Sequence, residues 1–140
     1  MLQPKRTKWR RSHLIWPKAA ASRGNTVAFG SFGLVATEAG YISNKQIESA
    51  RVVLSRYTKK TGKAYIRVFP YLGWTKKPAE VRMGNGKGTV EAWFAVIEKG
   101  TVMFEIGGVP DADCKEALHQ AGYKLSVKSR VIKKGEETRL

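Results

Sequence analysis

The stretch ISNKQIESARVVLSRYTKKTG, residues 42–62, carries the clearest structural signal in the sequence. Ser43 is followed three residues later by Gln46, which is the spacing of a helix capping box. Apolar residues then recur at helical spacing, at Ile47, Ala50, Val53, Leu54 and Tyr57. Gly62 is expected to end the helix, because glycine is common just after the last helical turn. The stretch therefore predicts an amphipathic helix that needs a partner for its apolar face.

The segments around this helix predict a sheet and a second helix. Residues 110–122 have a proline and two aspartates at the start, an apolar stripe and a closing glycine, which is typical of a helix. Short runs rich in β-forming residues predict strands at 27–36, 64–69, 90–97, 101–106 and 124–132. The turn at Gly100 predicts that 90–97 and 101–106 form a hairpin. The order β-α-β-loop-β-β-α-β indicates an α+β fold, with two helices against a mixed or antiparallel sheet.

The charge of the chain is strongly one-sided. It has 26 Lys and Arg residues against 11 Asp and Glu residues, a formal net charge of +15. Such an excess repels itself in a compact domain unless a polyanion neutralises it, so nucleic acid is the first candidate and an anionic membrane surface the second. Residues 1–23 contain seven basic residues and no acidic one, which predicts a basic arm. Residues 24–140 are expected to form a single domain with a long loop at 70–89.

This loop contains RMGNGKG, residues 82–88, where glycines alternate with polar or basic residues. A P-loop needs Ser or Thr directly after its lysine, but here Lys87 is followed by Gly88. A dinucleotide-binding turn needs G-x-G-x-x-G between a strand and a helix, and neither the spacing nor the context fits. The loop is therefore either a solvated flexible segment or a loop that approaches RNA phosphates. Its four cations, Lys76, Lys77, Arg82 and Lys87, favour the second interpretation.

No catalytic or metal-binding pattern is visible. Cys114 is the single cysteine and is expected to pack on the apolar face of the second helix. His13 and His119 are the only histidines, so we expect no metal site and no cofactor. Trp9, Trp16 and Trp74 accompany the basic segments and could stack on unpaired bases. These residue patterns together favour RNA binding. Two alternatives stay open: a membrane or acidic-protein partner, and a soluble enzyme.

Seven segments of the chain resemble the bacterial-type sixteenth-protein family of the large ribosomal subunit. They cover nearly the whole chain: MLQPKRTKWR at the start, GYISNKQIESAR, GKAYIRVFP, TKKPAEVRMGNGKG, AWFAVI, GTVMFEIGGVP and EALHQAGYKLSVK. The arm and the TKKP…RMGNGKG loop are the most specific of these. The chain departs from the family pattern at residues 12–18, SHLIWPK, where a more basic, Gly-containing stretch is usual, and at Ser126, where proline is common.

The resemblance implies a fold, a location and a set of partners. The fold would be an α/β sandwich of two helices on a mixed, mostly antiparallel sheet, with a β-hammerhead. The partners would be large-subunit ribosomal RNA, transfer RNA in the A and P sites near the peptidyl transferase centre, and neighbouring ribosomal proteins. The protein would support late subunit assembly in a cytoplasmic bacterial ribosome rather than an organellar one. It would not be an enzyme and would not act at a membrane.

The resemblance and the charge pattern together name the residues that we expect to contact RNA. The residues expected to bind ribosomal RNA are Lys5, Arg6, Lys8, Arg10 and Arg11 in the arm, and Arg51, Arg56, Lys59 and Lys60 in the first helix. The loop residues expected to face transfer RNA are Lys76, Lys77, Arg82, Met83, Gly84, Gly86, Lys87 and Gly88.

Overall fold

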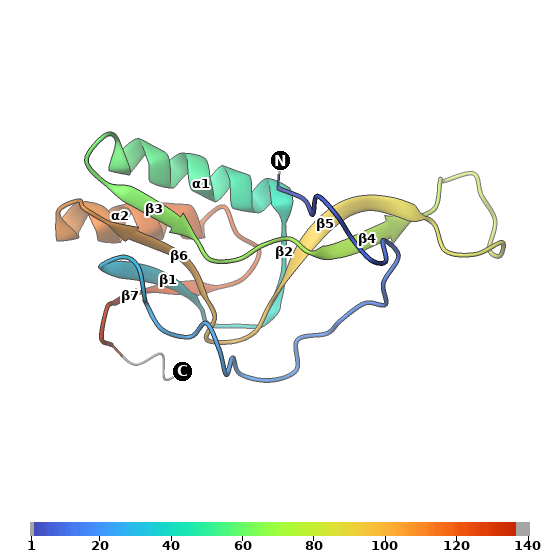
Figure 1. The fold of residues 1–140 in the computed structure, drawn as a ribbon, viewed down its shortest axis with the longest axis horizontal. Coiled ribbons are helices and arrows are strands. Elements are labelled where there is room, and N and C mark those ends of the chain that lie inside the picture. Colours follow the sequence, from blue (N-terminus) through green and yellow to red (C-terminus); the bar gives the residue numbers. More distant parts are fainter. Residues whose placement is uncertain (1, 137–140) are drawn as a thin grey trace.

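The computed structural model describes residues 2–136; Met1 and residues 137–140, at the ends of the expected arm and domain, lie outside the described residues. A four-stranded antiparallel sheet has the order β3 (Lys63–Ile66), β6 (Val102–Gly107), β1 (Phe32–Ala36), β7 (Ser129–Lys133). A three-stranded antiparallel sheet has the order β2 (Gly40–Ser43), β5 (Thr89–Ile97), β4 (Leu72–Lys76). The two helices are α1 (Asn44–Thr58) and α2 (Asp111–Gly122). This arrangement confirms the α+β class (Figure 1).

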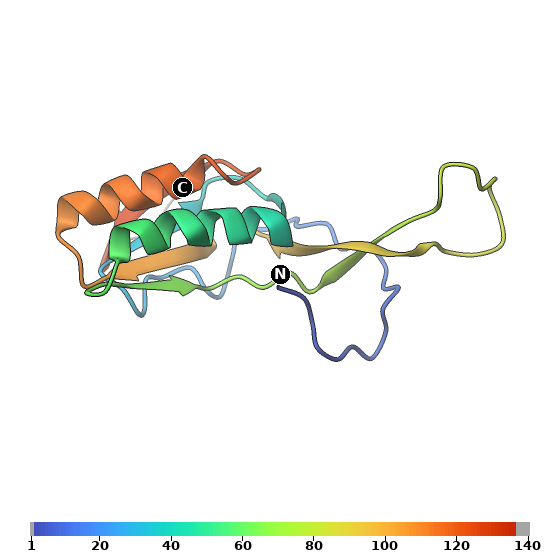
Figure 2. The ribbon, with the colours of Figure 1, turned by 90° about the horizontal axis from the view of Figure 1, so that it is seen from above.

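Both helices lie side by side on one face of the four-stranded sheet (Figure 2). Alternate residues of β1, such as Phe32 and Leu34, point into the core between sheet and helices. The helices contribute the stripes that their spacing predicts: Ile47, Ala50 and Leu54 from α1, and Cys114, Ala117, Leu118 and Ala121 from α2, all fully buried. Burial raises the pKa of the Cys114 thiol, which agrees with a packing role for this cysteine.

Helix α1 begins as expected and ends earlier than expected. Ser43 Oγ accepts the N–H of Gln46 at 3.2 Å, and Gln46 Oε1 accepts the N–H of Ser43 at 3.1 Å, which confirms the capping box. The helix ends at Thr58, because Lys59 takes a φ of 48°. The prediction that Gly62 ends the helix is therefore wrong. A Cβ on Gly62 would lie 2.9 Å from Val109 Cγ2, so this glycine serves close packing in the following turn.

The second sheet contains two strands that the sequence did not predict. β2 precedes α1 directly, and β4 lies within the range 70–89, which was expected to be irregular throughout. The irregular segment is shorter and spans residues 77–88. The strand β4 carries few β-forming residues and includes Gly73, whose absent Cβ leaves room for the carbonyl oxygen of Arg10 in the arm. Its strand conformation comes from pairing with β5 and not from its own composition.

The expected hairpin of residues 90–97 and 101–106 does not form. β5 pairs with β2 and β4, whereas β6 pairs with β1 and β3, so the two strands belong to different sheets. Gly100 has a φ of 92° and donates its N–H to the carbonyl of Ala36. The short connection thus redirects the chain from one sheet to the other. Short connections allow a hairpin but do not require one.

Three other strands are shorter than predicted, and one of them is β3, which ends at Ile66 and not at residue 69. Only residues 32–36 of the expected strand 27–36 belong to β1, and β7 begins at Ser129 instead of residue 124. After α2, the N–H groups of Lys124 and Leu125 bond back to carbonyls of the last helical turn, which delays the strand. Residues 27–31 fold across the outer face of the four-stranded sheet, opposite the helices. There Val27 joins Val35, Val102 and Ile132 in a second, smaller apolar cluster.

The Glu105 side chain holds residues 28–30 against this outer face. Its carboxylate is fully buried and accepts N–H groups from Ala28 at 3.0 Å, Phe29 at 2.6 Å and Gly30 at 2.7 Å. Arg67 Nη1 forms an ion pair with the same carboxylate at 2.8 Å. Burial alone would raise the pKa of Glu105, but the three backbone donors and Arg67 outweigh it and lower the pKa below its ordinary value. The chain therefore keeps this buried group ionised.

Replacing Glu105 by glutamine should destabilise the protein by about 3–5 kcal/mol at neutral pH, because a buried ion pair loses one partner. The lowered folded-state pKa means that this stabilisation is present above the unfolded pKa of about 4.3 and is lost as the pH falls through the folded value. Denaturant unfolding from pH 7 to 3 should therefore show the wild type and Glu105→Gln converging in acid. Glu91→Gln, at an exposed position of β5, is the matched control. A constant difference at all pH values would contradict the prediction.

Candidate nucleic-acid interface

The expected transfer-RNA loop is the tip of a long antiparallel ribbon. β4 and β5 pair up to Lys76 and Thr89, and residues 77–88 connect them. This ribbon extends away from the helices, so the loop lies at one end of the molecule (Figures 1 and 2). Residues 81–87 are all exposed, and Met83 near the tip has 97% of its surface exposed. The ribbon thus holds the loop well away from the core.

The loop glycines have two distinct structural roles. Gly84, Asn85 and Gly86 have φ values of 106°, 61° and 89°, a backbone region that side chains other than Asn rarely adopt. No atom lies within 4 Å of a Cβ placed on Gly84 or Gly86, so conformation and not crowding selects glycine there. Gly88 differs, because a Cβ would lie 2.7 Å from the carbonyl oxygen of Lys76 on the opposite side of the ribbon. Gly84, Asn85 and Gly86 thus shape the tip of the loop, and Gly88 allows a close approach of the backbone at its base.

Two of the four loop cations bond to the protein itself. Lys77 Nζ donates to the carbonyl of Gly84 across the loop. Lys87 Nζ donates to the carbonyl of Ser12 at 2.6 Å and so joins the loop to the arm. Lys76 and Arg82 are exposed and have no recorded partner within residues 2–136. Both can therefore meet an external anion, and of the two Arg82 lies within the exposed loop segment itself.

The basic arm is tied to the body of the protein at several points. Leu2 packs against the main core, and its carbonyl accepts the side-chain amide of Asn44 at 3.3 Å. Further along, Ile15 accepts a hydrogen bond from the hydroxyl of Tyr41, and Ala21 donates its N–H to Lys99 at 2.8 Å. Between these points the five expected RNA-binding side chains are all exposed: Lys5, Arg6, Lys8, Arg10 and Arg11. The arm therefore displays its charges from a backbone that follows the protein surface.

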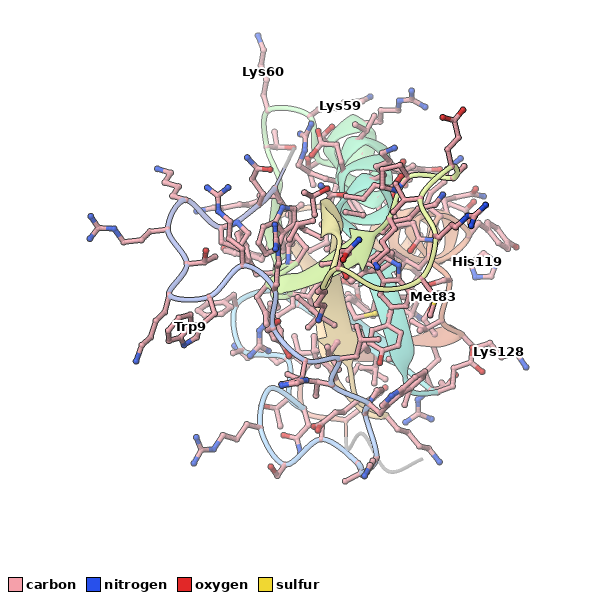
Figure 3. The ribbon with its side chains drawn as sticks, turned by 90° about the vertical axis from the view of Figure 1, so that its right-hand side faces the viewer. Trp9, Lys59, Lys60, Met83, His119 and Lys128 are labelled. Atoms are coloured by element: carbon pink, nitrogen blue, oxygen red, sulfur yellow. The ribbon has the colours of Figure 1, made fainter. Side chains whose placement is uncertain are left out.

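A hollow lies where the arm crosses the three-stranded sheet. It is lined by Gln3, Pro4, Lys5, Arg6, Thr7 and Arg10 from the arm and by Val90 and Trp93 from β5. The structure thus brings arm cations beside the base of the loop ribbon. Trp9 is 74% exposed and projects from the arm, on the side opposite Lys128 and His119 (Figure 3).

The segment 12–18 packs on an aromatic cluster through Trp16. The Trp16 ring meets Tyr41 edge-on, with ring centroids 5.6 Å apart. Tyr41 also contacts Trp74 at 6.1 Å and Phe94 at 6.4 Å. Trp74 is consequently half-buried and less accessible to a base than its expected loop position suggested, whereas Trp16 remains 63% exposed.

The basic residues of the first helix are not beside the loop. Helix α1 runs away from the ribbon, so its C-terminal end, which Lys59 and Lys60 follow directly, lies at the opposite end of the molecule (Figure 1). Arg51 is paired with Glu48 at 2.5 Å, and the hydrogen bond from Arg51 lowers the pKa of that carboxyl. Arg56, Lys59 and Lys60 are exposed. The expected RNA-binding residues therefore form two regions, one of arm and loop and one at the end of α1.

Most basic side chains have no acidic partner within the described range 2–136. The ion pairs between described side chains are Arg51–Glu48, Arg67–Glu105 and Lys133–Asp111, the last at 3.6 Å. None of them involves an arm or loop cation. Within residues 2–136 no cluster of His, Cys, Asp and Glu has the arrangement of a metal site. In the same range neither helix has the length and hydrophobicity that crossing a membrane requires.

Tyr41 helps to position the arm and Glu105 positions residues 28–30, and the sequence interpretation missed both. The one available signal for Glu105 was a lone acid inside the apolar run TVMFEI, which suggests a buried carboxylate. No local signal marks Tyr41, because its partners are distant in sequence.

Comparison with known proteins identifies the family. The family model described as "Ribosomal protein L16p/L10e" matches residues 4–132. The chain belongs to this family. It is 54% identical over 136 residues to "Large ribosomal subunit protein uL16" of Malacoplasma penetrans, covering 97% of both chains. The protein of the same name from Spiroplasma citri is 51% identical over 137 residues, covering 98% of this chain and all of the relative.

Membership confirms the resemblance that the arm and loop motifs indicated. A third relative, from Macrococcus caseolyticus, bears the same name and is 51% identical over 136 residues, covering 97% of this chain and 94% of the relative. The chain is therefore a ribosomal protein of the bacterial large-subunit type and a component of the translation machinery.

Replacing Tyr41 by alanine should loosen the arm, because it removes both the hydrogen bond to Ile15 and the ring contact with Trp16. Trypsin should then cleave the free protein at Lys18 about 5- to 30-fold faster, the effect expected for losing one hydrogen bond and one aromatic pair. Tyr123→Ala, an exposed tyrosine just after α2, is the matched control and should leave the rate unchanged. Equal cleavage of Tyr41→Ala and wild type would show that these contacts do not hold the arm.

Proposed function

We propose that this protein is a non-enzymatic constituent of the large ribosomal subunit that binds ribosomal RNA through its arm and the basic end of α1. Its loop then approaches transfer RNA near the peptidyl transferase centre, and its binding supports late subunit assembly. The family and the names of its relatives support the ribosomal part of this proposal. The observation that carries the RNA-binding part is the row of five exposed arm cations without carboxylate partners among the described residues.

The arm suits a phosphate backbone in both charge and placement. Phosphate contacts need closely spaced cations but little sequence-specific geometry, which matches Lys and Arg in an irregular segment. Because hydrogen bonds at Leu2 and Ile15 already hold the arm on the body, less conformational freedom is lost on binding. The arm therefore serves as an anchor for the whole domain.

The position and exposed backbone of the loop suit contact with a second RNA that binds transiently. It lies at the end of the ribbon, and its glycines expose the backbone to close approach. Arg82 can hold a phosphate with two parallel hydrogen bonds, which a lysine cannot reproduce. A contact of this kind positions a transfer RNA without reading its sequence.

Replacing Lys5, Arg6 and Lys8 together by alanine should reduce the salt dependence of ribosomal RNA binding. Each lost phosphate contact removes about 0.7–0.9 from the slope of log affinity against log salt, so the slope should fall by about 2 to 3. Filter binding of the full chain to its large-subunit RNA at four salt concentrations measures this slope. A control with Lys99, Lys115 and Lys124 replaced removes the same charge from elsewhere on the surface. An arm variant with the slope of the wild type would refute the anchoring role.

Replacing Arg82 by alanine should slow accommodation of aminoacyl-transfer RNA without reducing incorporation of the protein, because the arm and the end of α1 still hold ribosomal RNA. Arg82→Lys should be intermediate, since it keeps the charge but loses the paired hydrogen bonds. The measurement is rapid-mixing kinetics on subunits reconstituted with each variant, together with the occupancy of the protein in them. Lys124→Ala, an exposed lysine just after α2 to which no RNA contact is assigned, is the control and should leave accommodation unchanged. Lower occupancy with normal accommodation per complete ribosome would make the loop an assembly anchor instead.

A further inference from the structure

An aromatic pair with one exposed ring lies on the outer face of the four-stranded sheet, whereas the loop is carried by the three-stranded sheet. The Phe29 ring stacks on Tyr65 with centroids 5.6 Å apart and an angle of 25° between the rings. Phe29 is 63% exposed although it belongs to a well-packed segment. We call Phe29, Tyr65, Lys63 and Arg67 the aromatic–cation patch.

The alternation of β3 places three of these side chains together. Ala64 and Ile66 pack toward the core beneath the helices, so Lys63, Tyr65 and Arg67 project from the opposite face. β3 is an edge strand of its sheet, which leaves this side open to a partner. The patch follows directly after the turn that contains Lys59 and Lys60, and so continues the basic end of α1.

The backbone that carries Phe29 is fixed by buried contacts. Its N–H bonds to the Glu105 carboxylate, and so do the N–H groups of the residues on either side. A Cβ on Gly30 would lie 2.6 Å from the carbonyl oxygen of Ile106, so the segment rests directly on β6. The sheet therefore holds an aromatic ring outward in one orientation, which lowers the entropy lost when a flat ligand stacks on it.

The charges around the patch favour a polyanion. Lys63 Nζ lies 5.2 Å from the centroid of Tyr65, and Arg67 Cζ lies 5.5 Å from that of Phe29. Lys134 Nζ adds a third cation, 3.3 Å from the carbonyl oxygen of Ala28. The carboxylate in contact with these residues is Glu105, which is fully buried and already paired with Arg67. An apolar protein surface would leave Lys63 without a counter-charge, whereas RNA supplies both bases and phosphates.

We propose that the aromatic–cation patch binds ribosomal RNA by stacking an unpaired base on Phe29, while Lys63 meets an adjoining phosphate. Exposed aromatic rings on a rigid sheet face are a recurrent means of holding single-stranded bases. The patch rests on the proposed RNA-binding function and adds to it a contact region that depends on stacking more than on charge.

The test compares Phe29→Leu with Phe29→Tyr in the full chain. Leucine keeps the apolar bulk and removes the ring, whereas tyrosine keeps the ring. We expect Phe29→Leu to weaken binding to the large-subunit RNA about 5- to 100-fold, the range for loss of one stacked base. Phe29→Tyr should stay within about twofold to threefold of the wild type. Both should keep the wild-type salt slope, because stacking releases no counterions.

Two outcomes would overturn the proposal that the aromatic–cation patch stacks an RNA base. If Phe29→Leu binds like the wild type, any apolar side chain suffices and the ring does not stack on a base. If Phe29→Leu changes the salt slope, its effect is electrostatic. The arm variant in the same assay separates this test from the proposed function. If the arm variant keeps the wild-type salt slope while Phe29→Leu binds the RNA more weakly, the anchoring role of the arm is refuted and the patch is supported.

A second measurement needs no substitution. Ultraviolet cross-linking of the wild-type protein in the assembled large subunit should attach nucleotides to peptides containing Phe29 or Tyr65. Cross-links confined to arm and loop peptides would count against the patch, even if Phe29→Leu should prove too unstable to assay.

Discussion

The ionised carboxylate of Glu105 connects parts of the chain that no local preference would bring together. It lies in β6, accepts three backbone N–H groups from residues 28–30, and pairs with Arg67 just beyond β3. A buried charge of this kind is tolerated only when its hydrogen-bonding capacity is filled, and here it is. Because this contact holds residues 28–30 on the outer face of the sheet, it also fixes the position from which Phe29 meets Tyr65. One acidic residue in a basic protein thus fixes the backbone of a surface on which cations predominate.

The remaining charge is arranged around this core without internal neutralisation. The arm and loop cations have no acidic partners among residues 2–136, and some bond to backbone carbonyls instead, as Lys87 does with Ser12. A carbonyl can hold such an ammonium group in place without cancelling its charge. The protein therefore shapes its basic surface in advance and leaves the neutralisation to its ligand. This division of roles suits a component that becomes part of a large ribonucleoprotein.

The sequence predicted those features of the fold that depend on residues close together in the chain. The capping box at Ser43 and the apolar stripes of both helices were visible in the sequence, because the residues that define each pattern are spaced within one or two turns of each other. β2, β4 and the separation of β5 from β6 were not, since strand pairing depends on residues far apart in the chain. Prediction of the candidate nucleic-acid interface from the sequence has the same limit. The exposed cations were identifiable by type, but the bonds that place them, Tyr41 to Ile15 and Lys87 to Ser12, join distant residues.

The order in which the chain is made gives the docked arm a further consequence. The arm is synthesised before the residues that hold it: Tyr41 and Asn44 follow the arm, and Lys87 and Lys99 come later still. Domains generally begin to fold from their N-terminal end during synthesis, yet this arm has to wait for most of the chain. A growing polypeptide thus presents an undocked polycation to a cell rich in RNA. Until Lys87 and Lys99 are made, the arm's cations therefore lack some of the contacts that hold them in the folded protein.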